Sequence, residues 1–229
     1  MKPLLELAPG KFAHPGGALW LPEPRAVLVA DVHLGYGWAQ RRRGELGPVI
    51  DGGARDRLLA LLDELNPVRV VFLGDLVHAP KPGAEERAIV EDAVNTLASR
   101  TQLTVVPGNH DRGFAADFRG LPLEQTTVWK HAGVAAVHGD APGEAPPAPC
   151  LVLGHLHPAY TVHDAAGAGR KLPAFLRSRR AIVLPAFTPF SPGFDVARGL
   201  PNGLRAVLGH GPIRVAVTTG ARVVWIRSL

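Results

Sequence analysis

Five apolar segments of this sequence are each followed at once by side chains that can bind a metal ion. Aspartate and asparagine supply oxygen ligands and histidine supplies a nitrogen ligand, a mixture that suits divalent ions such as manganese, iron or zinc. These side chains are Asp31, His33, Asp75, Asn109, His110, His138, His155 and His157. Their types and positions predict a metal-dependent chemistry, provided that the fold brings the ends of the segments together.

Each of these residues has an ordinary explanation when it is considered alone. Aspartate and asparagine commonly form turns at the end of a strand, and a single histidine is usually a hydrogen-bonded polar residue. Considered together they fit that explanation poorly, because five of the ten histidines directly follow apolar segments. We therefore expect these side chains to converge on one site.

The number of candidate ligands bears on how many ions the site holds. Without His110, the set contains two carboxylates, one amide oxygen and four imidazoles, which exceeds the four ligands of a tetrahedral zinc site. If one carboxylate bridges, the set suits two divalent ions, and we expect manganese, with iron or zinc as alternatives. Two ions about 3.5–4 Å apart are a known device for phosphoryl chemistry. His110 and Asp111 then form an imidazole and an orienting carboxylate suited to proton transfer.

The segments that must position these side chains have the length and composition of buried strands. They are rich in valine, leucine and isoleucine and do not alternate with polar residues, as expected for strands covered on both faces. They span residues 26–30, 68–74, 103–108, 133–137, 150–154 and 181–187. Amphipathic patterns over 55–65 and 86–97 predict helices between the first three. This alternation predicts an α/β fold, in which ligands gather beyond the carboxyl ends of the strands.

The later part of the chain has a different pattern. Residues 213–227 predict a hairpin around Thr219 and Gly220, so we expect a mixed sheet. The proline-rich stretch 140–149 predicts a surface loop, because strand-like segments lie on both sides of it. We expect one domain over residues 1–229.

Composition limits the class of protein and the kind of partner. The 229 residues are 46% hydrophobic and 20% charged, which is typical of a globular protein. No apolar run approaches the roughly 18 residues of a membrane helix, and the single cysteine, Cys150, cannot form an internal disulfide. We expect a soluble, cytoplasmic protein. The net charge of +5, with 20 arginines against 5 lysines, favours anionic partners but can also reflect coding bias.

The order of these motifs resembles the calcineurin-like metallophosphoesterases. The blocks "DVH", "GD", "GNHD", a later histidine and "GHLH" occur in that order over residues 31–157. The resemblance implies a sandwich of two mixed β-sheets flanked by helices. It implies one ion at Asp31, His33, Asp75 and His157, and a second at Asp75, Asn109, His138 and His155. By the same resemblance Asp75 bridges the ions, His110 contacts the phosphate and assists the leaving group, and Asp111 supports His110.

A narrower resemblance covers most of the chain. The stretches "ADVHLGYGWAQRRRGELGP", "LGDLVH", "GHLHP" and "LPAFTPFSPGFDV" are similar to the bacterial ICC-like phosphoesterases, which include the ligase-associated DNA damage response endonuclease (PdeM) family. This similarity implies a phosphodiester substrate, with DNA as the expected one, and an association with a DNA ligase, a helicase and an exonuclease. Arg41, Arg42 and Arg43 are candidates for binding substrate phosphates, with a solvated basic face as the alternative. His78 is a candidate either for a role beside the substrate phosphate or for a purely structural role.

Three functions remain open on the sequence. The leading one is a dinuclear metal-dependent phosphodiesterase associated with DNA repair. The second is a small-molecule phosphatase or a cyclic-nucleotide phosphodiesterase that uses the same ions. The third is a non-catalytic scaffold of the same fold, which the presence of every candidate ligand disfavours.

Overall fold

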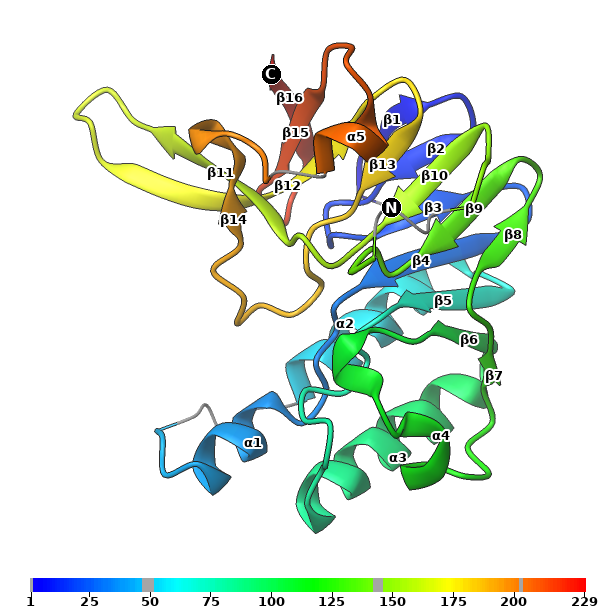
Figure 1. The fold of residues 1–229 in the computed structure, drawn as a ribbon. Coiled ribbons are helices and arrows are strands. Elements are labelled where there is room, and N and C mark those ends of the chain that lie inside the picture. The colour runs from blue at the N-terminus through cyan, green and yellow to red at the C-terminus, as the bar shows by residue number, and fades with distance from the viewer. Residues whose placement is uncertain (1, 47–51, 142–145, 202–203) are drawn as a thin grey trace.

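Two β-sheets lie face to face, with helices outside them (Figure 1). The computed structural model describes residues 2–46, 52–141, 146–201 and 204–229. The first sheet contains, in order, β1 (Leu5–Ala8), β2 (Lys11–Ala13), β3 (Leu19–Leu21), β4 (Ala26–Ala30), β5 (Arg69–Leu73), β6 (Gln102–Val106) and β7 (Glu124–Gln125). The pairs from β1 to β4 are antiparallel and those from β4 to β7 are parallel, so this sheet is mixed.

The second sheet has nine strands and a branch. Its main path is β14 (Phe194–Asp195), β11 (Pro158–His163), β12 (Gly169–Arg177), β13 (Ala181–Val183), β10 (Cys150–Leu153), β9 (Val134–Val137) and β8 (Trp129–His131). The branch is the hairpin of β15 (Arg214–Thr218) and β16 (Val223–Ser228), which pairs with β12 through β15. β10 is parallel to both β9 and β13, whereas β12 is antiparallel to its partners, so this sheet is mixed as well.

Helices cover the outer faces of the sheets. They are α1 (Tyr36–Arg42), α2 (Gly52–Leu65), α3 (Ala84–Ala98), α4 (Phe114–Asp117) and α5 (Leu204–Leu208), with short 3-10 turns at η1 (Asn109–Asp111) and η3 (Val196–Arg198). No helix in the ranges given above is both long and apolar enough to cross a membrane.

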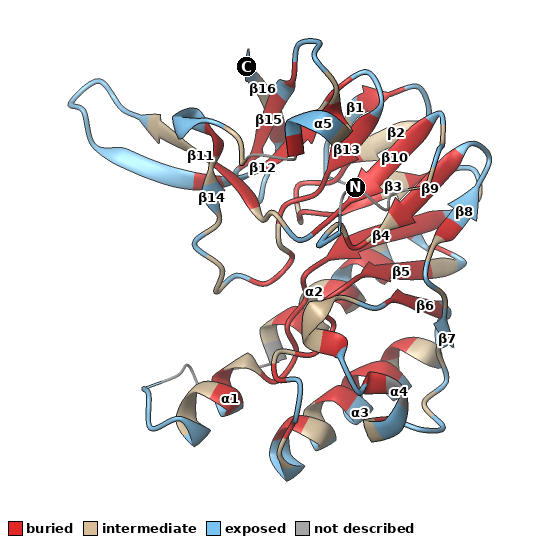
Figure 2. Ribbon diagram, viewed as in Figure 1, coloured by how far each residue is buried: buried red, intermediate tan, exposed pale blue. Residues whose placement is uncertain are grey.

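Alternate side chains of the central strands enter two different cores. Val27 and Val29 of β4 pack with α2 and α3, whereas Leu28 faces the second sheet in a core that includes Phe175 and Ile182. Every residue of β4 is buried, and the buried residues of Figure 2 concentrate on such strands. This burial on both faces explains the continuous apolar composition. The predicted sandwich of two mixed sheets flanked by helices is therefore confirmed.

The predicted elements agree with the observed ones where the pattern was strong. The six apolar segments correspond to β4, β5, β6, β9, β10 and β13, the two helical patterns to α2 and α3, and the hairpin to β15 and β16. The sequence did not predict β1 to β3, α1 or the β11–β12 hairpin, whose strands are short or largely exposed and lack a clear apolar pattern. Of the predicted loop over 140–149, residues 142–145 lie outside the described part of the chain.

Candidate metal centre

The carboxyl ends of strands from both sheets meet at one edge of the sandwich. β4, β5 and β6 are parallel neighbours, so Asp31, Asp75 and Asn109 leave the first sheet side by side. β9 and β10 are parallel neighbours in the second sheet and deliver His138 and His155. The sheets are joined here, because the amide of Thr188 donates to the carbonyl of Asp31 at 3.1 Å. The predicted convergence therefore follows from the strand order.

The backbone at this edge is strained. Eight residues other than glycine have a positive φ in the described chain, and five of them are candidate ligands: Asp31, His33, Asp75, His155 and His157. Such a conformation costs about 1–3 kcal/mol for each residue and persists only where the surrounding structure imposes it. Its concentration at one edge indicates a functional site.

The first ligand cluster contains Asp31, His33 and His157, whose ligand atoms lie within 4.8 Å of one another. Oδ1 of Asp31 is 3.2 Å from Nε2 of His157, and both atoms are buried without a hydrogen-bond partner. Nδ1 of His157 lies 2.8 Å from Oγ of Ser191, a contact that can fix the imidazole orientation. Buried polar atoms without partners are costly, and a bound cation would satisfy these.

The second ligand cluster contains Asp75, His138 and His155, with Asn109 beside them. Nδ1 of His138 donates to the carbonyl of Leu73 at 3.1 Å, which assigns a lone pair to its Nε2. That Nε2 faces Oδ1 of Asn109 at 3.1 Å and Oδ1 of Asp75 at 3.7 Å, which are also acceptors. Nδ1 of His155 also lies 3.1 Å from this Nε2, so two imidazole nitrogens and two side-chain oxygens gather where a cation can bind. The donor set therefore fits a second divalent ion.

Asp75 lies between the two clusters. Its Oδ1 faces His138 of the second cluster, and its Oδ2 is 3.9 Å from Nε2 of His33 in the first. Oδ1 also accepts a hydrogen bond from the amide of His110 at 2.9 Å. One carboxylate therefore presents an oxygen atom to each cluster.

Comparison with known proteins places this arrangement in a family. The family model of the calcineurin-like phosphoesterases matches residues 24–212. The chain belongs to this family. It is thus a hydrolase that acts on phosphoester bonds, and the metal-dependent chemistry of the family agrees with the two clusters.

Solved structures provide a comparison of the fold. A nuclease, MPE, from Pseudomonas putida is 22% identical, with 99% of this chain and 100% of that chain covered and a TM-score of 0.72. Yfce, a phosphoesterase from E. coli, is 17% identical, with 89% and 97% of the two chains covered and a TM-score of 0.43. No curated protein matches the sequence. The first likeness agrees with the fold of this phosphoesterase.

The motif "GNHD" of the phosphoesterase forms the turn η1 after β6. Nδ1 of His110 lies 2.6 Å from the backbone carbonyl of His78, so this carbonyl orients the imidazole. The carboxylate of Asp111 accepts from the amides of Gly108 at 2.9 Å, Val77 at 3.1 Å and Leu76 at 3.4 Å. Asp111 therefore fixes the loop that carries His110, whereas the ring itself is held by a backbone carbonyl.

A third group of imidazoles lies next to the first cluster. The ligand atoms of His33, His78 and His110 lie within 4.8 Å of one another. Both ring nitrogens of His78 are buried without a hydrogen-bond partner. His78 therefore lies at the site, between His33 of the first cluster and His110 of η1.

Burial favours the neutral form of three imidazoles of the centre, those of His33, His78 and His155. It lowers the pKa of His33 to about 2, with the charges of His78 and His157 adding to the effect. Burial also lowers the pKa of His78 to about 4, aided by His110 and Arg43, and lowers the pKa of His155. Neutral imidazole is the form that binds metal, so the folded protein holds these rings ready for an ion.

These pKa shifts predict how the metal-free protein responds to acid. The unfolded chain protonates His33 and His78 below pH 6.5, whereas the folded protein resists until about pH 2 and 4. As the pH falls from 6.5 toward these values, His33 lowers the free energy of unfolding by up to about 1.4 kcal/mol per pH unit, and the partly exposed His78 lowers it by less. Burial raises the pKa of Asp111 to about 6. Protonation of Asp111 below that pH therefore favours the folded state and partly offsets the effect of the histidines.

We expect urea unfolding of the metal-free protein to show a net loss of stability between pH 6.5 and 4. His33→Asn should flatten this dependence, whereas His131→Asn, an exposed position, should leave it unchanged. Equal slopes in the wild type and in His33→Asn would contradict the pKa assignment.

Three glycines pack against the candidate ligands. A Cβ atom on Gly108 would lie 2.4 Å from Oδ1 of Asp75 and 2.8 Å from Nε2 of His138. A Cβ atom on Gly74 would lie 1.9 Å from Nδ1 of His138, and one on Gly154 would lie 3.0 Å from Oδ2 of Asp31. Glycine at these positions lets the backbone approach the ligands closely.

Gly108→Ala should weaken metal binding by about tenfold or more, because the added methyl group displaces two ligand side chains. Titration calorimetry with Mn²⁺ measures this affinity. Gly211→Ala is the matched control, since nothing lies within 4 Å of its Cβ position and its φ is not positive. Wild-type affinity in Gly108→Ala would show that the ligands can move aside without loss of binding.

The arginine run at the end of α1 does not act as one group. The guanidinium of Arg42 pairs with Glu86 at 3.2 Å, and that of Arg41 lies over the ring of Trp38 at 5.0 Å. Arg43 lies close enough to His78 to lower its pKa. Of the three, Arg43 has the clearest link to the centre.

Proposed function

We propose that this phosphoesterase binds two divalent ions and hydrolyses nucleic-acid phosphodiesters. One ion would be held by Asp31, His33 and His157 and the other by Asn109, His138 and His155, while Asp75 serves both. The observation that carries the proposal is the position of Asp75, whose two oxygens face different clusters. Manganese is the expected ion, because the mixed oxygen and nitrogen ligands suit it, with iron or zinc as alternatives.

The protein groups around the ions have distinct parts in the proposed reaction. When bound, the ions would neutralise phosphate charge and lower the pKa of a water molecule. His110 would donate a proton to the leaving oxygen, since the carbonyl of His78 orients its ring. Asp111 would keep His110 in place by accepting hydrogen bonds from the amides of Gly108 and Val77. The His78 ring, which has no hydrogen-bond partner, would contact the phosphate.

The choice of nucleic acid rests on charge and on resemblance. The net charge of +5 favours polyanions, and the Pseudomonas putida protein of similar fold is a nuclease. Among the three arginines of the run, Arg43 would contact a substrate phosphate, because it lies near His78. A cytoplasmic role in DNA repair, beside a DNA ligase, a helicase and an exonuclease, is supported by the narrower resemblance of the sequence.

A screen of purified protein separates the candidate substrates. The protein, loaded with Mn²⁺, Fe²⁺ or Zn²⁺, is assayed with chromogenic phosphate mono- and diesters, a cyclic nucleotide and single- and double-stranded DNA. We expect hydrolysis of the diester and of DNA, with Mn²⁺ the most effective ion. Hydrolysis of small esters without cleavage of DNA or RNA under any ion would replace the nuclease with a small-molecule phosphatase or phosphodiesterase.

A further inference from the structure

Two depressions beside the candidate metal centre lie next to each other along β12. The first, of about 300 Å³, is lined by the candidate ligand His157, by Ser191 and by Lys171. The second, of about 420 Å³, is lined by Lys171, Arg170 and Gly220. The two share a wall made of residues 171–173 of β12 together with Ala186, Thr188 and Pro189. The two depressions are therefore adjacent, and together they extend from the centre toward the turn between β15 and β16. The pair is called here the β12 groove.

The β12 groove is lined by cations and by no carboxylate. Its basic side chains are Lys2, Arg57, Arg170 and Lys171, and neither depression has an aspartate or glutamate in its lining. Among the described residues, none of the four forms an ion pair with a carboxylate. The groove therefore carries positive charge that the protein itself does not neutralise.

Backbone carbonyls orient three of these cations without cancelling their charge. The Arg57 guanidinium donates to the carbonyls of Phe187 at 2.5 Å and Gly16 at 2.8 Å. Nζ of Lys171 donates to a carbonyl at 3.4 Å and Nζ of Lys2 to another at 3.1 Å. Arg57 is held in the wall, whereas Arg170 and Lys171 are exposed on β12 and can reach a ligand.

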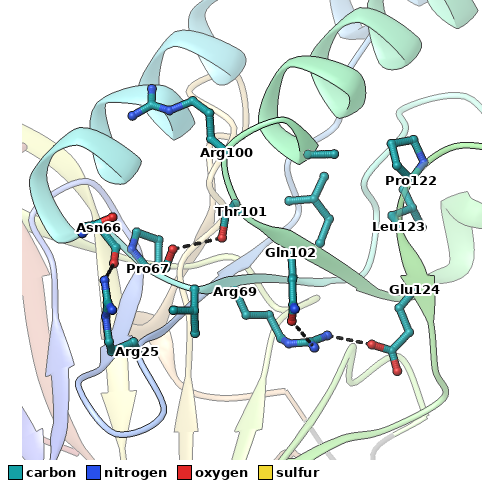
Figure 3. Close-up of a pocket in the computed structure, with 13 residues that line it drawn as sticks. Arg25, Asn66, Pro67, Arg69, Arg100, Thr101, Gln102, Pro122, Leu123 and Glu124 are labelled. Atoms are coloured by element: carbon teal, nitrogen blue, oxygen red, sulfur yellow. Dashed lines mark hydrogen bonds and ion pairs between the residues drawn. The ribbon is translucent and has the colours of Figure 1, made fainter.

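A third depression also contains arginines, but it differs from the β12 groove in how their charges are paired. It measures about 800 Å³ and lies at the amino ends of β5 and β6, the sheet edge opposite the metal centre. There Arg69 pairs with Glu124 at 2.7 Å, as Figure 3 shows, and Arg100 pairs with Asp63 at 2.6 Å. Two of its three arginines are thus neutralised, while Arg25 donates to the backbone carbonyl of Asn66. Its larger size alone therefore does not make it a site for anions.

We propose that the β12 groove binds the backbone phosphates of a single DNA strand on one side of the phosphodiester held at the metal centre. Arg170 and Lys171 contact these phosphates, and Arg57 supplies a fixed positive charge in the wall. The proposal rests on the proposed function and adds the path of the substrate. Phosphate contacts position a strand without reading its sequence, so the groove selects for length and charge.

The test compares how strongly two oligonucleotides inhibit hydrolysis of a small chromogenic diester by the metal-loaded protein. In the wild type, a thymidine 12-mer should inhibit at far lower concentration than a thymidine dinucleotide, because only the 12-mer fills the groove. Arg170→Ala with Lys171→Ala should remove most of this advantage. It should also reduce the salt dependence of 12-mer inhibition by about 1.4 in log–log slope, about 0.7 for each lost contact with a single strand.

The matched control is Arg179→Ala with Arg180→Ala. These arginines are also adjacent and exposed, lie beyond the other end of β12 and line neither depression. This variant loses the same charge and should retain the advantage of the 12-mer. If both double variants retain, or both lose, the advantage of the 12-mer over the dinucleotide, the groove proposal is wrong. Tight inhibition of the wild type by the 12-mer would in that case still support the nuclease proposal.

Two other outcomes separate the groove from the proposed function. If the wild type hydrolyses the diester but the 12-mer inhibits no better than the dinucleotide, the groove proposal is wrong and the phosphoesterase stands. If no ion supports hydrolysis, the dinuclear proposal is wrong.

Fluorescence anisotropy of a labelled 12-mer with the same three proteins then tests the groove without turnover. Tight binding lost only in the Arg170 and Lys171 variant would support it, and any other result would overturn it.

Discussion

Asp75→Asn should reduce hydrolysis of a phosphodiester by about a thousandfold or more, the equivalent of several kcal/mol of transition-state stabilisation. Asn retains one oxygen but loses the charge and the second oxygen ligand. Since Oδ1 and Oδ2 of Asp75 face His138 and His33, one ion would lose its oxygen ligand and the other would keep only a neutral amide oxygen. The measurement is steady-state turnover together with bound metal after gel filtration.

The comparison that makes this prediction specific is His155→Asn. His155 belongs to one cluster only, so its loss should affect one ion and reduce turnover less than the loss of Asp75. Circular dichroism and a urea midpoint should show that both variants fold. Near-normal turnover with two tightly bound ions in Asp75→Asn would show that Asp75 does not bridge.

His110→Ala should reduce turnover by about 10²–10⁴-fold for substrates with poor leaving groups, the usual range for a lost general acid. The loss should be small for nitrophenyl esters, whose leaving group needs little proton assistance. Metal content should stay at the wild-type level, because the proposed assignment gives His33, but not His110, to the first ion. His131→Ala removes an exposed imidazole and should change neither quantity.

Two results would contradict the role given to His110. Loss of a metal ion would show that His33, His78 and His110 form a ligand group, which their distances permit. An equal loss of turnover for good and poor leaving groups would indicate that His110 positions the phosphate or stabilises its charge. Each result would leave the phosphoesterase assignment intact.

The sequence predicted which side chains gather at the candidate metal centre because one rule of sheet topology governs their positions. Asp31, Asp75 and Asn109 follow strands that proved to be parallel neighbours, so their convergence needed only the correct strands. The continuous apolar pattern of 26–30 was readable because both faces of β4 are buried. A strand that is buried on both faces can be recognised in the sequence by its continuous apolar composition. The residues directly after it are then predicted to lie at the end of the strand.

Contacts to backbone groups could not be predicted in the same way. The partner of the His110 ring is the carbonyl of His78, a group that every residue carries. Ser191, which contacts His157, lies in a segment whose polar residues have no distinctive spacing. Asp111 was expected to support His110, and the amides of Gly108, Val77 and Leu76, which donate to its carboxylate, could not be predicted. Such partners depend on the path of the chain in space.

Surface charge was the other part that the sequence left open. Arg41, Arg42 and Arg43 are consecutive, yet one stacks on Trp38, one pairs with Glu86 and one lies near His78. Arg170 and Lys171 were not predicted as candidates, because the β11–β12 hairpin that carries them was not predicted. Neutralisation depends on which carboxylates lie nearby, and a linear pattern does not reveal that.

The central claim is that the chain holds two divalent ions on clusters that share Asp75. The most direct test is elemental analysis of wild-type protein and Asp75→Asn after saturation with Mn²⁺ and removal of free metal. We predict about two ions per chain in the wild type and about one or fewer in the variant. A fully active wild type with a single ion per chain would contradict the dinuclear centre.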